Sequence, residues 1–190
     1  MLEKYFKNAS EQFAKPFVLV LAKFRIKPNT VSIIGLIIVL LGSYYFYVDN
    51  KLLGIILIFL GSAVDGLDGP YARHQNLVSE RGAVLDSFID RLGELFIWSV
   101  VAIGFTSNDI ELFIVLSILV ASNLIPYIRA KSESYGITNK AGITARPERV
   151  IFAVIFMFFD LDYVFMYIFT YVYIYTVSYT HLTLPTICSV

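Results

Sequence analysis

Four aspartates form the pattern in this sequence that carries the clearest chemistry. Asp65 and Asp68 are three residues apart, and Asp86 and Asp90 are four residues apart. Either spacing places the two side chains of a pair on one face of an α-helix. The segment between the pairs, at about 74–81, is short, which makes the two helices antiparallel neighbours. The two pairs are therefore expected to face each other across one pocket.

Acidic side chains in such a pocket require positive charge among them. Adjacent carboxylates repel one another, and an unpaired carboxylate has a high free-energy cost if its helix lies in the apolar interior of a membrane. Two divalent cations would balance the formal charge of the two pairs. A ligand set of oxygen atoms, with no Cys or His on these faces, favours Mg2+ or Mn2+ over zinc. The alternative is a purely structural network of the acids with Arg73 and Arg91.

Small residues accompany the acids. Gly66, Gly69, Ala72 and Gly82 leave backbone uncovered, which lets a bulky or phosphorylated group approach closely. Small residues also serve helix packing in membranes, so the glycines alone do not separate a ligand site from a packing interface. Pro70 removes a helical hydrogen bond and is expected to bend its helix just past the first acid pair.

The elements that must position these side chains are membrane helices. Hydrophobic residues make up 57% of the 190 residues and charged residues 16%, against about 25% in an ordinary soluble domain. This composition excludes a disordered chain, a basic nucleic-acid-binding domain and a soluble enzyme with a charged shell. Apolar runs occupy residues 31–48, 52–64 with a polar continuation to 72, 95–105, 110–128, 150–159 and 163–177. We expect an all-α integral membrane protein with six transmembrane helices in a catalytic domain at 28–177.

The basic residues predict the orientation of these helices. Of the 15 Lys and Arg residues, only Lys51 falls in a loop on the side opposite to the N-terminus. Under the positive-inside rule, the N-terminus and the acidic pocket face the cytoplasm, in a multi-pass protein of the cell membrane. Residues 1–27 interleave bulky apolar and basic side chains, which is typical of an interfacial amphipathic helix. An ordinary solvated helix is the alternative for this segment.

Two short segments border the predicted domain. Pro28-Asn29-Thr30 is expected to break the chain and to cap the next helix through Asn29 or Thr30. Residues 178–190 contain no Lys or Arg where a cytoplasmic terminus is expected, and they resemble translated adapter sequence. We therefore interpret them as a tail of doubtful origin. The single cysteine, Cys188, lies in this tail, and one cysteine excludes a disulfide framework and a Cys-type zinc site.

The acids and small residues together carry a family resemblance. The stretch Asp65-Gly66-Leu67-Asp68-Gly69-Pro70-Tyr71-Ala72-Arg73 is followed by eight residues, Gly82, three residues, Asp86, three residues and Asp90. This spaced pattern resembles the signature of the CDP-alcohol phosphotransferases at all eight of its fixed positions. The resemblance extends over about 28–159 in the layout of the spans.

The resemblance implies displacement of CMP from a CDP-linked lipid by an alcohol. It implies that Asp65, Asp68, Asp86 and Asp90 hold two metal ions, with Asp90 also acting as the general base. Two cations would neutralise the diphosphate and the charge on the CMP leaving group. The residues that the resemblance assigns to the cytidine diphosphate are Asn29, Asp65, Gly69, Ala72, Arg73 and Gly82.

Basic residues near the fourth and fifth spans bear on the acceptor alcohol. Arg129, Lys131, Arg146 and Arg149 are suited to bind a phosphate, although they are also typical of positive-inside residues that meet lipid head groups. The segments 127–133 and 146–149 resemble the phosphatidyl- and archaetidylinositol phosphate synthases. We therefore predict inositol 1-phosphate as the acceptor, with glycerol 3-phosphate as the alternative.

The other partners follow from the same reasoning. The donor is CDP-diacylglycerol or CDP-archaeol, which the sequence does not separate, and no nucleic acid is expected. The resemblance implies a homodimer, to which Trp98 and Gly104 are candidate contributors. A protein that binds or transports divalent cations through the four aspartates is the alternative from another class. It is disfavoured because the outer halves of the second, third and fourth spans contain no ionisable group.

Overall fold

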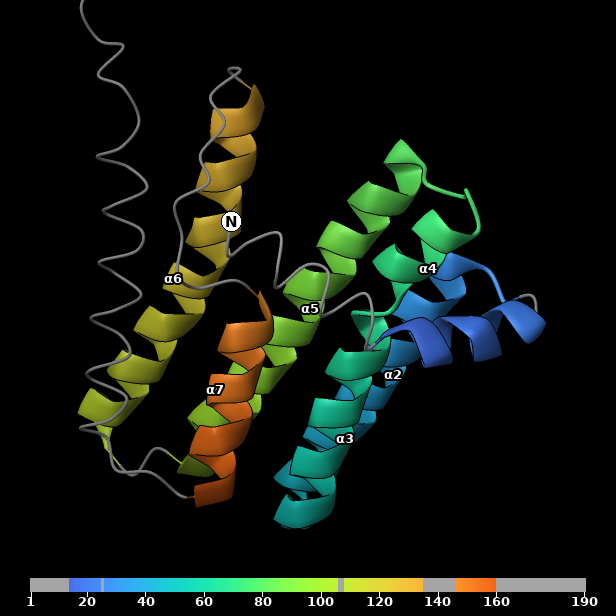
Figure 1. Ribbon diagram of the computed structural model, residues 1–190. Helices are drawn as coiled ribbons and strands as arrows, with labels where there is room; N and C mark the ends of the chain where they lie inside the picture. Colours follow the sequence, from blue (N-terminus) through green and yellow to red (C-terminus); the bar gives the residue numbers. More distant parts are fainter. Residues whose placement is uncertain (1–13, 25, 106–107, 135–145, 160–190) are drawn as a thin grey trace, which may run out of the picture.

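The computed structural model describes residues 14–24, 26–105, 108–134 and 146–159, and the regular structure in these ranges is helical, without a strand (Figure 1). The prediction of an all-α protein is therefore confirmed over the described chain. A helical segment at 14–23 precedes the numbered helices. These are α2 (Pro28–Tyr47), α3 (Lys51–Asp65), α4 (Asp68–His74), α5 (Glu80–Phe105), α6 (Asp109–Ser134) and α7 (Arg146–Phe159).

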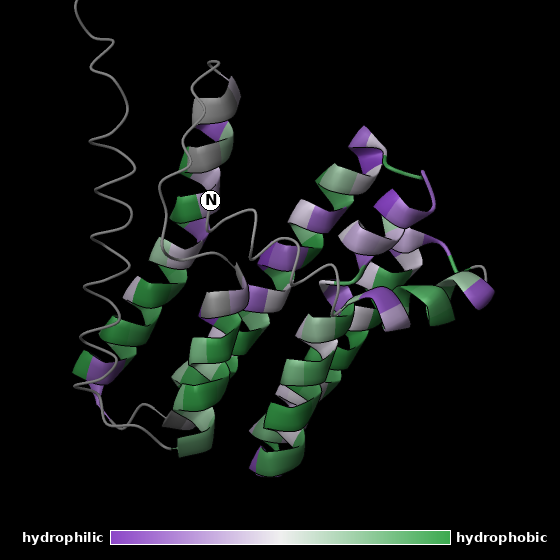
Figure 2. Cartoon of the chain, in the orientation of Figure 1, coloured by the Kyte–Doolittle hydropathy of each residue, from purple (hydrophilic) through white to green (hydrophobic). Residues whose placement is uncertain are grey.

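Three of the described helical stretches are long and apolar enough to cross a membrane. They are Pro28–Tyr47, Lys51–His74 and Asp109–Ile128, and Arg149–Phe159 is a shorter apolar helix. Helix α5 has 26 residues but carries several charges in its first half. The predicted sixth span at 163–177 and the tail at 178–190 lie outside the described residues. Figure 2 shows hydrophilic residues gathered around α4 and the start of α5, and apolar residues over the rest of α2, α3 and α5.

Helices α2 and α3 form an antiparallel hairpin whose backbones touch at glycines. A Cβ atom added to Gly42 would lie 2.7 Å from the amide nitrogen of Ile58, and one added to Gly61 would lie 2.7 Å from the carbonyl oxygen of Gly35. A Cβ atom at Gly35 would lie 2.7 Å from the Cβ of Asp65. Such close approach is typical of small-residue interfaces between membrane helices. The hairpin therefore holds the end of α3, with Asp65, against α2.

The break in the second predicted span lies between the first two acids. Helix α3 ends at Asp65 and α4 begins at Asp68, with Gly66 and Leu67 in a turn between them. The sequence predicted a bend just past Asp68, the second acid of the first pair. This position was wrong, because the break lies before Asp68. Because a proline ring clashes with the carbonyl group four residues earlier and provides no N–H for it, Pro70 disrupts the helix at Gly66.

The N-terminal helical segment packs against α2 and α4. The hydroxyl group of Tyr71 donates a hydrogen bond of 2.5 Å to the carbonyl oxygen of Ile26, and Tyr71 is buried in one cluster with Val18 and Val31. Figure 1 shows the segment lying across the ends of the long helices. Its outer face exposes apolar side chains, among them Phe17 and Phe24, as an interfacial helix requires. Residues 1–13 of the predicted helix lie outside the described chain.

The second half of the chain packs around one large apolar side chain. Trp98 of α5 is 1% exposed and lies in a core that α2, α3, α5, α6 and α7 share. A Cβ atom at Gly104 would lie 2.8 Å from the ring of Phe46. The expectation that Trp98 and Gly104 contribute to a dimer interface was therefore wrong for Trp98, and Gly104 makes its close contact within the chain.

A buried ion pair joins α5 to α7. The Nη2 and Nε groups of Arg149 donate hydrogen bonds of 2.6 and 2.9 Å to Oε1 of Glu94. Both side chains are almost fully buried, at 7% and 5% exposure. Glu94 lies four residues after Asp90, so the pair fixes α7 to the stretch of α5 that carries the second acid pair.

We expect Glu94→Ala to lower the free energy of unfolding by about 3–5 kcal/mol, because it leaves a buried guanidinium group without its carboxylate. Denaturant or thermal unfolding in detergent measures this loss. The double variant Glu94→Leu with Arg149→Met removes both charges and should recover most of the stability. A loss below about 1 kcal/mol in Glu94→Ala would contradict the structural role of the pair.

Candidate active site

The structure brings together three of the four predicted aspartates. One carboxylate oxygen from each of Asp65, Asp68 and Asp86 lies within 4.8 Å of the other two. Asp65 ends α3, Asp68 begins α4, and Asp86 lies in the second turn of α5. The turn between α4 and α5 therefore brings the first acid pair together with Asp86 of the second. Asp90 lies one turn further along α5, is half-buried and is not part of this group.

The aspartate group is suited to a hard divalent cation. All three ligand groups are carboxylates, which Mg2+ and Mn2+ prefer. Asp65 is 1% exposed, whereas Asp68 and Asp86 are half-buried and open toward a pocket. Because three carboxylates this close repel one another, a cation among them would relieve their repulsion. The donor set therefore fits the predicted metal.

A pocket of about 300 Å3 adjoins the aspartate group, and we call it the polar pocket because it contains the charged side chains of Asp68, Asp86 and Arg73. Asp68 and Asp86 line it, and so do five residues that the sequence assigned to the nucleotide: Asn29, Gly69, Ala72, Arg73 and Gly82. These residues come from α2, α4 and α5, so the fold collects them on one hollow. The sixth residue assigned to the nucleotide, Asp65, is buried behind this lining.

Asn29 takes part in the pocket and does not cap its helix. Lys27 is the N-cap of α2, no side chain makes a capping hydrogen bond there, and Pro28 opens the helix. The expectation of a cap from Asn29 or Thr30 was therefore wrong, since Pro28 is itself a favourable first residue without an N–H to satisfy. A Cβ atom on Gly82 would lie 3.3 Å from Oδ1 of Asn29, so Gly82 allows the starts of α2 and α5 to approach.

Two serines of the site were not predicted from the sequence. Ser79 lines the polar pocket, and its Oγ accepts a 3.1 Å hydrogen bond from the amide of Gly82, as an N-cap residue of α5 does. Ser32 of α2 donates a 2.5 Å hydrogen bond to Oδ2 of Asp68. A serine before Glu80 was a visible capping signal, but nothing in the spacing linked Ser32 to an acid 36 residues away.

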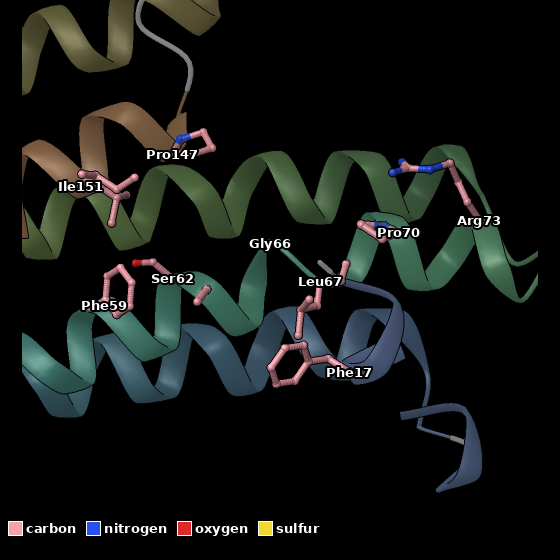
Figure 3. A pocket seen from close by; sticks show the side chains of 12 residues that line it. Phe17, Phe59, Ser62, Gly66, Leu67, Pro70, Arg73, Pro147 and Ile151 are labelled. Carbon is pink, nitrogen blue, oxygen red and sulfur yellow. The ribbon is translucent and has the colours of Figure 1, made fainter. Parts of the chain in front are cut away.

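A second, apolar cavity of about 560 Å3 lies between the N-terminal segment, α3 and α7. Figure 3 shows Phe59 and Ile151 toward one end of it and Arg73 toward the other. Arg73 lines this cavity and also the polar pocket. One basic side chain therefore stands where a polar hollow meets an apolar one.

The predicted acceptor residues are described only in part. The side chains of Arg129 and Arg146 lie outside the description. Lys131 is exposed near the end of α6. Arg149 is 6% exposed and paired with Glu94, so it differs from the open phosphate ligand that the sequence suggested.

A family model described as CDP-alcohol phosphatidyltransferase matches residues 25–180. The chain belongs to this family. The resemblance read from the signature is thereby confirmed, and the family does not support the alternative of a cation transporter. The protein is an enzyme of phospholipid synthesis, a CDP-alcohol phosphotransferase with membrane helices and an aspartate cluster suited to a metal.

Related proteins share most of the length of this phosphotransferase. An archaetidylinositol phosphate synthase of Pyrococcus horikoshii is 38% identical over 141 residues, which are 74% of this chain and 73% of that protein. The crystal structure of Mycobacterium tuberculosis phosphatidylinositol phosphate synthase with CDP-DAG bound is 25% identical, with a TM-score of 0.78, and covers 90% of this chain and 93% of its own. The same synthase in complex with manganese and citrate also has a TM-score of 0.78 at 25% identity, covering 93% of this chain and 92% of its own.

The contact of Gly35 with Asp65 generates a prediction for this phosphotransferase. Gly35→Ala should raise the Mn2+ concentration for half-maximal CMP release about tenfold, because the added Cβ displaces Asp65. Gly42→Ala is the matched control, since its Cβ would lie just as close, 2.7 Å, to Ile58 in the outer half of the hairpin. Equal Mn2+ requirements in the two variants would contradict the role of Gly35.

Proposed function

We propose that this enzyme transfers a phosphatidyl or archaetidyl group from a CDP-linked lipid to a hydroxyl group of inositol 1-phosphate and releases CMP. The observation that carries the donor assignment is the position of Arg73, which lines both the polar pocket and the apolar cavity. A CDP-lipid has a charged head and apolar chains joined at a diphosphate. Its head suits the polar pocket, its chains suit the apolar cavity, and its diphosphate suits a guanidinium group between them.

The polar pocket would hold the cytidine diphosphate. Asn29, Gly69, Ala72, Arg73 and Gly82 line it, and Asp65 lies behind it. Gly82 lets Asn29 approach the start of α5 closely, which brings the amide group of Asn29 to the edge of this pocket. The apolar cavity would offer mostly apolar side chains to the lipid chains and does not separate CDP-diacylglycerol from CDP-archaeol, so both are donors in this proposal.

The aspartates would hold two Mg2+ or Mn2+ ions. Asp65, Asp68 and Asp86 form the described group, and Asp90 would complete the ligand set from the next turn of α5. When bound, the ions supply positive charge that neutralises the diphosphate and the departing CMP. Support comes from the manganese complex of the structurally similar synthase.

Asp90 would act as the general base. Its carboxylate accepts the proton of the acceptor hydroxyl group while the hydroxyl oxygen forms a bond to the phosphorus atom on the lipid side of the diphosphate. The bond between that phosphorus atom and the bridging oxygen breaks, and the electron pair leaves with CMP. Asp90 follows Asp86 by one helical turn, so in this proposal the base would lie next to the metal ligands.

Basic residues of α6 and α7 would bind the phosphate of the acceptor. We assign this role to Arg129, Lys131, Arg146 and Arg149. Glu94 holds the guanidinium group of Arg149 by two hydrogen bonds, which fixes the position of this basic group on α7. Support for inositol phosphate comes from the names of the archaetidylinositol and phosphatidylinositol phosphate synthases that the chain resembles.

We further propose six spans, with the N-terminus and the active site facing the cytoplasm, and a homodimer. The side of the molecule that holds the N-terminal segment, α4 and the start of α5 is the hydrophilic one in Figure 2. Lys15, Lys23, Lys27, Arg73 and Arg81 lie on this side, as the positive-inside rule requires of a cytoplasmic face.

Release of CMP tests this function. Purified enzyme in liposomes with a CDP-lipid and Mn2+ should release CMP with inositol 1-phosphate and not with glycerol 3-phosphate. Asp90→Asn should lower the rate by about 10²- to 10⁴-fold, because the amide cannot accept the hydroxyl proton.

Asp49→Asn is the matched control for the loss of a carboxylate. Asp49 lies between α2 and α3, at the other end of the hairpin from Asp65, and has a φ of 68° that asparagine also tolerates. The Asp49→Asn variant should release CMP at the wild-type rate. Release with glycerol 3-phosphate alone would identify glycerol 3-phosphate as the acceptor and contradict inositol 1-phosphate. No release with either acceptor would contradict the proposed function.

A further inference from the structure

Ser32 makes a hydrogen bond that ties α2 to the aspartate group. Its Oγ lies 2.5 Å from Oδ2 of Asp68, and the serine is 2% exposed. Hydrogen bonds from a hydroxyl group to an ionised carboxylate are short, about 2.5–2.7 Å, and about twice as strong as neutral ones. The donor side of this contact is buried, and the acceptor is a carboxylate of the aspartate group.

The hydroxyl proton of Ser32 has two acceptors within reach. The carbonyl oxygen of Pro28, four residues earlier, lies 3.4 Å from Oγ, and Oδ2 of Asp68 lies 2.5 Å from it. A serine inside a helix commonly donates to the carbonyl group four residues back. Because the carboxylate oxygen is much closer than the carbonyl oxygen, it accepts the hydrogen bond from the hydroxyl group. Ser32 thus serves Asp68 instead of its own helix.

Asp68 is the member of the group that most needs such support. Gly35 seats the backbone of Asp65 against α2, and Asp86 belongs to the 26-residue helix α5. Asp68 instead follows the break at residues 66–67 and begins a helix of seven residues. Its side chain is half-buried and opens into the polar pocket. The hydrogen bond from Ser32 restricts the rotation of this carboxylate.

We propose that Ser32 is a positioning residue of the metal centre, which holds the carboxylate of Asp68 in the orientation that places its ligand oxygen near those of Asp65 and Asp86. This inference rests on the proposed function, because it requires that the aspartate group bind a divalent metal. Hydrogen-bond partners that orient metal ligands typically contribute about 10- to 100-fold in metal affinity. In a variant without the Ser32 hydroxyl group, the carboxylate of Asp68 is ordered only when the ion binds. The entropy cost of this ordering lowers the metal affinity.

The same helix offers a matched control. Ser43 is 3% exposed, lies about three turns further along α2, and its buried Oγ has no hydrogen-bond partner. Ser43→Ala therefore deletes the same atom from a similarly buried site without touching the aspartates. A contribution of Ser32 to helix packing alone would change the stability of the metal-free protein and leave metal affinity unchanged.

The test is a Mn2+ titration of the full chain in detergent, with free Mn2+ followed by electron paramagnetic resonance. Ser32→Ala should bind Mn2+ about tenfold more weakly than wild type, and Ser43→Ala should bind it with unchanged affinity. The melting temperature of each metal-free variant is recorded alongside. Should Ser32→Ala not fold, Ser32→Cys retains the volume with a weaker donor and should show the same direction of change.

The outcomes separate this inference from the function on which it rests. Wild-type affinity in a folded Ser32 variant would overturn the inference, and so would an equal loss in Ser43→Ala. Asp65→Asn provides the reference for the centre itself and should abolish tight Mn2+ binding. If wild type and Asp65→Asn bind Mn2+ alike, the metal centre of the proposed function fails, and the inference fails with it.

Discussion

The backbone contact between α2 and α3 is the constraint on which the site depends. Glycines on both helices remove every side chain that would separate the two backbones, and the contact continues to Gly35 and Asp65 at the end of α3. Lipid offers no hydrophobic driving force between helices, so close van der Waals packing must hold them. The same contact that stabilises the hairpin therefore buries a carboxylate at a fixed point. Asp65 is thereby held beside Asp68 and Asp86, where a cation would relieve the repulsion among the three carboxylates.

The helix break beside Asp65 turns this fixed point into a pocket. Pro70 interrupts the span at Gly66, and the chain resumes as α4 in a slightly different direction. Asp68, Gly69, Ala72 and Arg73 then line the polar hollow, while α3 before the break lines the apolar cavity. An uninterrupted helix would present these residues on a single cylinder. The break thereby lets one span line both hollows, which the proposed head group and chain of the donor would occupy.

Charge inside the protein is neutralised locally. Glu94 and Arg149 are both almost fully buried, and each would be costly without the other. Their pairing also ties α7 to α5 close to the aspartates. It thereby fixes the position of Arg149, one of the predicted ligands of the acceptor phosphate. Ser32 acts in a similar way on Asp68, with a hydroxyl group in place of a charge. The polar groups of the site are thus held by other polar groups and not by apolar packing alone.

The sequence by itself determined the helical class, the family and the identity of the acidic group. Hydropathy follows from side-chain chemistry, and the spacing of Asp65, Asp68, Asp86 and Asp90 is fixed by helical periodicity, so both can be read along the chain. The resemblance, and not physical reasoning, also assigned Asn29 and Gly82 to one site with the acids, and both line the polar pocket beside Asp68 and Asp86. The position of the break was predicted imperfectly because a proline acts four residues before itself. Only the tertiary structure decided that Ser32 meets Asp68 and that Glu94 pairs with Arg149. Those contacts join helices far apart in sequence, and their partners are chosen by how the helices pack, for which local spacing contains no signal.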